Sequence, residues 1–144
     1  MAYREKIAWL AVAGIAAAYI PFFIAVALIA RTGQPSIQRF LILFAAASAV
    51  RVAIELGGRF VIAARSGGDA RAPADERDRA ISRRGAATAY YVLMAGMILV
   101  GIVMPLEAGA QGWRIATAAL LMLVVAETVS YAVTISQYRR GWHG

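Results

Sequence analysis

Two long stretches of this sequence contain no charged residue, and they limit the fold more than any other feature. Residues 7–30 form an uncharged, largely apolar run of 24 residues, and residues 85–104 form a second run of 20. A helix rises about 1.5 Å per residue, so roughly 20 residues cross the hydrocarbon core of a bilayer. Both stretches are therefore predicted to be membrane-spanning helices.

Two further spans are predicted, although each contains charges. Residues 38–64 and 115–137 are long and largely apolar. In lipid the backbone polar groups must be paired within the protein, which a helix achieves within one segment. We therefore predict an all-α fold, a polytopic membrane four-helix bundle. Residues 1–144 would form one membrane domain, with spans at 7–30, 38–64, 85–104 and 115–137 and a connection at 65–84.

A cleaved signal peptide is the alternative for the first span. Arg4 and Lys6 precede the apolar run, and three small residues at 25–27 resemble a cleavage site. However, the run is longer than the hydrophobic region of a typical signal peptide, and it continues past these small residues. We therefore expect a retained membrane helix.

The basic residues predict the orientation of the bundle. Two precede the first span, six lie in residues 65–84 and two follow the last span, which places ten on one side and only three on the other. Cytoplasmic connections carry the excess of Lys and Arg. We expect a multi-pass protein of the bacterial inner membrane, with both termini and residues 65–84 in the cytoplasm. Because topology accounts for the net charge of +7, the lipid bilayer is the expected partner, and no direct nucleic acid binding is expected.

Three charged residues follow one another at intervals of four in the second predicted span. They are Arg51, Glu55 and Arg59. Residues four apart lie on the same face of a helix, so Glu55 can bridge the two arginines. A lone charge in the middle of a bilayer costs about 3 kcal/mol on insertion scales, and pairing lowers this cost.

A glutamate in the fourth span is predicted at the same level as Arg51. Arg51 lies about 18 Å along its helix from Arg39, and Glu127 lies about 19–20 Å from Arg114, at 1.5 Å per residue. Both helices run in the same direction from those outer markers. We therefore predict an ion pair between Arg51 and Glu127.

This charge network has two interpretations, which the residues leave open. In the first, a structural seam or conformational switch joins five residues: Arg51, Glu55, Arg59, Glu127 and Tyr131. In the second, Glu127 serves a small proton-coupled transporter or exporter. A glutamate matched by an arginine keeps its negative charge, which makes it poorly suited to taking up protons. The structural interpretation is therefore the one we favour.

The residue inventory argues against an enzyme. The chain has no cysteine and one histidine, and it lacks the Gly-x-Ser-x-Gly, His-Glu-x-x-His and phosphate-loop motifs. No catalytic residue, metal site or cofactor is expected. The expected role is a non-enzymatic membrane protein, either regulatory or sensory or a subunit of a membrane complex. Its expected partners are a second copy or a larger membrane complex, and a cytoplasmic regulator protein.

Acidic and basic residues alternate just before the third span. Asp75 is a predicted N-cap, and Glu76 and Asp78 place acids in the first turn, where they favour the helix dipole. We expect a helix from about Asp75 that runs without a break into the third span. A solvated helix start is the simplest interpretation of Asp75, Glu76, Arg77 and Asp78; docking to a cytoplasmic partner is the alternative.

The stretch ADERDRAISRRGAATAYYVLMAG, residues 74–96, resembles an uncharacterised family of small bacterial and archaeal four-span membrane proteins. In that family a D-E-R-D motif in the cytoplasmic connection runs directly into the third helix, and Asp75, Glu76, Arg77 and Asp78 match it. Members are often encoded beside small helix-turn-helix regulators. The resemblance implies a sensory or regulatory role, with no established activity to transfer.

Overall fold

The computed structural model describes residues 3–33, 36–66, 75–106 and 111–140, and these residues are almost wholly helical. Residues 67–74 of the predicted cytoplasmic connection lie outside the described part. The elements are α1 (Tyr3–Thr32), α2 (Ile37–Ser66), α3 (Glu76–Ile98), η2 (Leu99–Val103), α4 (Met104–Leu106) and α5 (Gly112–Arg140).

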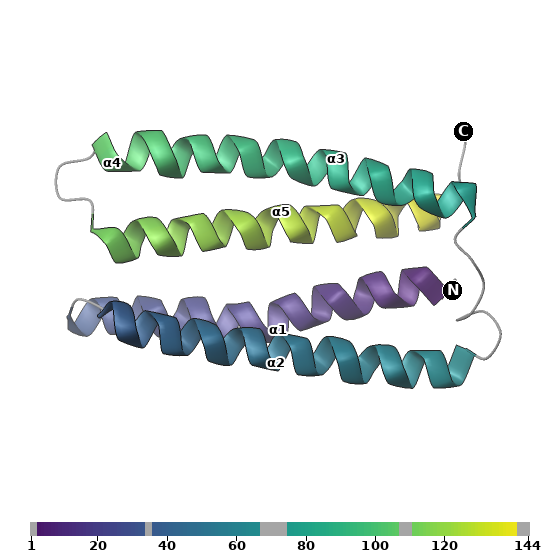
Figure 1. Ribbon diagram of the computed structural model, residues 1–144, viewed down its shortest axis with the longest axis horizontal. Coiled ribbons are helices and arrows are strands. Elements are labelled where there is room, and N and C mark those ends of the chain that lie inside the picture. Colours follow the sequence, from purple (N-terminus) through teal and green to yellow (C-terminus); the bar gives the residue numbers. More distant parts are fainter. Residues whose placement is uncertain (1–2, 34–35, 67–74, 107–110, 141–144) are drawn as a thin grey trace.

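Four rods make up the described chain, because α3, η2 and α4 continue one another (Figure 1). All four are long and apolar enough to cross a membrane. The prediction of an all-α four-helix bundle is confirmed, and the chain has the makeup of a multi-pass membrane protein. Each helix is longer than its predicted span, since it continues into polar residues at one or both ends.

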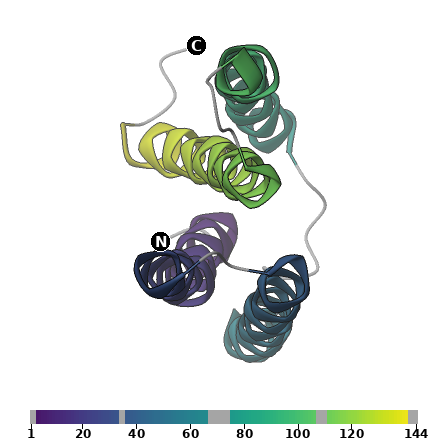
Figure 2. The same ribbon diagram turned by 90° about the vertical axis from the view of Figure 1, so that its left-hand side faces the viewer.

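The rods run alternately up and down. α1 packs on α2, α3 packs on α5, and α1 and α5 join the two pairs at the centre of the bundle (Figure 2). The first residues of α1 and α3 and the last residues of α2 and α5 therefore lie at the same end (Figure 1). We call this end of the bundle the terminal end.

A single π-helical turn, η2, interrupts the third rod just before Pro105. The backbone N–H of Met104 donates to the carbonyl of Leu99, five residues earlier. Proline has no N–H and cannot continue the α-helical pattern, and a π-turn is one way in which a helix accommodates such a break. The rod continues through α4 to Leu106.

Buried apolar residues lie in both halves of the bundle, and the aromatic cluster lies in the half away from the terminal end. Phe22 of α1 lies at its centre, with ring centroids 5.6 Å from Phe40 and 6.3 Å from Phe44 of α2, both edge-on. Leu120 and Val124 of α5 pack against this cluster. Edge-to-face aromatic pairs contribute beyond their buried area, so this half is held by apolar packing.

Small residues allow α3 and α5 to approach each other closely in the half near the terminal end. Gly85 is buried, and a Cβ atom added to it would lie 2.9 Å from the backbone oxygen of Ser130. A side chain at this position would push the two helices apart. Ile81, one turn earlier in α3, is fully buried. The close approach places the polar side chains of α3 and α5 within reach of each other.

Candidate functional site

Arg51 and Glu127 form a two-pronged ion pair between α2 and α5. Nη1 of Arg51 donates to Oε2 of Glu127 at 2.7 Å, and Nη2 donates to Oε1. The two side chains are largely shielded, with exposed fractions of 18% for Arg51 and 29% for Glu127. Such bidentate geometry matches the planar guanidinium to both carboxylate oxygens. The ion pair links the α1–α2 helix pair to the α3–α5 helix pair.

Glu55 extends the network along α2. Its Oε1 accepts from Nε of Arg51 at 2.9 Å, and its Oε2 lies 3.5 Å from Nη2 of Arg59. Arg51 is shielded, whereas the side chain of Arg59 is 51% exposed. Arg51 therefore binds the carboxylates of Glu127 and Glu55 at the same time. Arg59 is a second, more exposed partner of Glu55.

Tyr19 of α1 is a member of this network that the sequence did not single out. The guanidinium carbon of Arg51 lies 5.7 Å from the centre of its ring, and Tyr19 itself is buried. A cation over an aromatic face is attracted by the ring. The only hint in the sequence is that Tyr19 is the sole polar side chain within residues 7–30 apart from Trp9. Tyr131, which was predicted, packs on the edge of the apolar core.

A second cluster ties three helices together at the terminal end. Asp78 of α3 accepts from Nε of Arg4 in α1 at 2.8 Å and from the hydroxyl of Tyr138 in α5 at 2.5 Å. Sequence patterns assigned Arg4 to topology and did not connect it with Asp78. The residues come together because α1, α3 and α5 all have an end here. Nothing in their spacing along the chain indicates it.

Glu5 and Arg139 add a peripheral contact to the terminal end. Nε of Arg139 lies 3.6 Å from Oε1 of the buried Glu5, and its guanidinium stacks over the ring of Trp9 at 5.4 Å. This contact joins α1 to the last turn of α5.

The predicted cytoplasmic motif divides into two kinds of residue. Asp75 caps α3, since its Oδ1 accepts from the backbone N–H of Glu76 at 2.7 Å, and Asp78 is occupied by Arg4 and Tyr138. Glu76 and Arg77 are exposed. The helix starts where the sequence predicts. Two of the four motif residues thus serve the fold, and two face outward.

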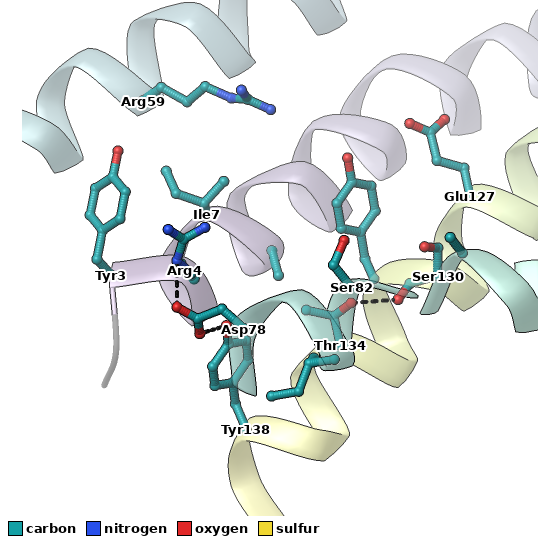
Figure 3. A pocket seen from close by; sticks show the side chains of 14 residues that line it. Tyr3, Arg4, Ile7, Arg59, Asp78, Ser82, Glu127, Ser130, Thr134 and Tyr138 are labelled. Atoms are coloured by element: carbon teal, nitrogen blue, oxygen red, sulfur yellow. Dashed lines mark hydrogen bonds and ion pairs between the residues drawn. The ribbon is translucent and has the colours of Figure 1, made fainter. Parts of the chain in front are cut away.

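A cavity of about 450 Å³ connects the two clusters. Figure 3 shows side chains from α1, α2, α3 and α5 around it, including Arg4, Arg59, Asp78, Glu127 and Tyr138. Most of the remaining polar lining consists of hydroxyl groups from α3 and α5. The cavity thus has a polar wall from the terminal end to the carboxylate of Glu127.

No group of three or more metal-ligating side chains occurs in the described residues. The polar groups there are arginines, carboxylates and hydroxyls, which can hold water or a small polar molecule and can exchange ion-pair partners. Comparison with protein-family models, curated proteins and solved structures finds no match for this chain. The resemblance of residues 74–96 to a four-span family therefore stays a prediction.

Proposed function

We propose that the chain is a non-enzymatic protein of the bacterial inner membrane, with both termini in the cytoplasm, that acts as a regulatory protein or as a subunit of a membrane complex. The observation that supports this proposal is that the charged side chains inside the bundle form ion pairs with one another. Arg51 holds Glu55 within α2 and Glu127 of α5, so the ion pair between Arg51 and Glu127 joins two helices near the middle of the bundle. Because these charged side chains bind one another, they favour a protein that holds its helices in one arrangement or switches between two arrangements.

The terminal cluster suggests how a partner would act on that arrangement. Glu76 and Arg77 are exposed in the first turn of α3, next to Asp78, which holds Arg4 of α1 and Tyr138 of α5. A cytoplasmic protein bound to Glu76 and Arg77 would contact the first turn of α3, which also contains Asp78. Its binding would favour one setting of three helices, since a partner shifts an equilibrium by its unequal affinity for two states.

Affinity purification from native membranes tests this role. The variant with Glu76→Ala and Arg77→Ala removes the outward charges while leaving Asp75 and Asp78 in place. We expect a specific partner to be recovered with the unaltered chain and lost with this variant. Arg39→Ala is the matched control, since it removes an exposed charge at the opposite end of the bundle. An identical set of recovered proteins for all three chains would contradict a role for Glu76 and Arg77.

Transport through Glu127 is the second candidate function, and one observation favours it. The carboxylate lines a cavity that extends to the terminal end. Uptake of a cationic dye into proteoliposomes, driven by a pH gradient and lost in Glu127→Gln, would establish this function. Dye uptake equal to that of empty liposomes would contradict a transport function.

A further inference from the structure

The cavity between the two clusters runs deep into the bundle. Along α5 its wall extends from Tyr138 to Glu127, which is 11 residues and therefore about 16 Å of helix. Its described wall contains two cations, Arg4 and Arg59, and two acids, Asp78 and Glu127. In Figure 3, Arg59 extends from α2 toward the side of the cavity on which Glu127 lies. Each of these groups has an ion-pair partner, but hydrocarbon packed against the wall would leave their remaining hydrogen-bonding sites unsatisfied, which is costly.

The carboxylate of Glu127 has hydrogen-bonding capacity that Arg51 does not use. Two guanidinium N–H groups donate to it, whereas an ionised carboxylate offers about four lone-pair sites. The side chain is 29% exposed, and it lines the cavity. Water in the cavity would satisfy the remaining sites, as buried water does for other polar groups.

The bundle is apolar on the other side of the ion pair, where a second cavity of about 390 Å³ is lined only by apolar residues of α1 and α2. Arg51 lies over Tyr19, and the next turn of α1 brings Phe22 against Phe40 and Phe44 of α2. Leu120 and Val124 of α5 pack on the same cluster. This half presents apolar side chains, whereas the cavity near the terminal end has charged and hydroxyl groups in its wall.

We propose that the cavity is an aqueous vestibule, open at the terminal end alone, which brings water and small polar solutes to Glu127. A volume of about 450 Å³ holds on the order of 15 waters at about 30 Å³ each. The vestibule hydrates the outer side of the Arg51–Glu127 pair, while the aromatic cluster prevents passage to the opposite face. This inference concerns solvent access, and it holds whether the chain regulates a partner or transports a solute.

Cysteine accessibility tests the vestibule directly, because the chain contains no native cysteine. Ala86 of α3 and Ser130 of α5 line the cavity, and Ala86→Cys and Ser130→Cys change side-chain volume little. The matched control for the first is Ala87→Cys, the next residue, which is outside the cavity lining. Ser82→Cys, at an exposed lining residue one turn after Asp78, marks the face of the membrane at the terminal end. Each variant is purified, checked for a monodisperse elution profile and reconstituted into sealed vesicles.

Two membrane-impermeant methanethiosulfonates, one cationic and one anionic, are then added to one face at a time. For each variant, the faster of the two labelling rates is compared with that of the other variants. We expect Ala86→Cys and Ser130→Cys to react from the face that labels Ser82→Cys. They should react at least about tenfold faster than Ala87→Cys, since the reagent attacks the thiolate and an apolar environment suppresses thiolate formation.

Two results would overturn the vestibule. Rates for Ala86→Cys and Ser130→Cys that match the rate for Ala87→Cys would show that lipid chains or packed side chains fill the space. Equal labelling of Ser130→Cys from both faces would show a continuous pore. The two cavity positions lie on different helices, so misfolding of one variant leaves the other as a complete test.

Discussion

Arg51 holds two carboxylates, whereas Glu127 is paired with Arg51 alone among the described residues, and this asymmetry predicts unequal costs for removing each charge. In Glu127→Gln, Arg51 keeps its 2.9 Å contact with Glu55. In Arg51→Gln, Glu127 loses its partner and Glu55 keeps only Arg59, at 3.5 Å. The arginine should therefore be the more costly loss, although each substitution removes one charge from the same ion pair.

The magnitude follows from how shielded the pair is. Removing one partner of a fully buried ion pair costs about 3–5 kcal/mol. Because Arg51 and Glu127 remain 18% and 29% exposed, we expect Arg51→Gln to cost about 2–3 kcal/mol and Glu127→Gln about 1 kcal/mol. The double variant should cost less than the sum of the two, with a coupling energy of about 1 kcal/mol.

The assay is reversible unfolding in mixed micelles with increasing dodecyl sulfate, followed by far-UV circular dichroism. Arg39→Gln provides the control, as an exposed charge at the opposite end, and should change the free energy of unfolding by less than about 0.5 kcal/mol. Equal costs for the two single variants would refute the asymmetry. Additive costs in the double variant would refute the contact itself.

Substitutions at four further positions have expected effects on the same free energy of unfolding. Gly85→Ala should cost about 1–3 kcal/mol, because its Cβ would press on the backbone of α5, whereas Gly57→Ala, with open space around it, should stabilise α2 by about 0.5–1 kcal/mol. Asp75→Ala should cost about 1 kcal/mol by removing the N-cap, with faster amide exchange in the first turn of α3. Asp78→Asn keeps an acceptor for Tyr138 but loses the ion pair with α1, so it should cost about 0.5 kcal/mol, and Asp78→Ala should cost more.

Helix lengths and the positions of side chains along each helix axis could be predicted from the sequence, because both follow from counting residues along the chain. Long, largely apolar runs indicated the helices, and the acids Asp75, Glu76 and Asp78 indicated where α3 begins. Counting helical rise placed Arg51 and Glu127 at one level, and these two side chains are in contact. Periodicity of four placed Arg51, Glu55 and Arg59 on one face, and the two contacts of Glu55 lie along it.

Helix rotation and neighbour choice could not be predicted, and the missed residues depend on both. Tyr19 lies in a helix so rich in alanine and other apolar residues that no face stands out, so its place beneath Arg51 depends on how α1 is rotated. The Arg4–Asp78–Tyr138 cluster requires α1, α3 and α5 to be neighbours. The cavity depends on the space left between four helices, which no local pattern encodes.

Interhelical polar contacts are added to the apolar packing in only one half of the bundle among the described residues, and this difference bears on how such a protein could respond to a partner. The half around Phe22 depends on apolar contacts, which are non-directional and have no alternative partner in water. In the half around Asp78 and Glu127, directional contacts accompany the buried Ile81 and Ile135. Water or another charge can replace the partly exposed contact between Arg4 and Asp78 at modest cost. Helix movement at the terminal end would thus exchange one set of polar contacts for another, while the aromatic cluster keeps the helices together. A signal received at the exposed turn of α3 would reach Arg51 and Glu127 through the half of the bundle where contacts are exchangeable.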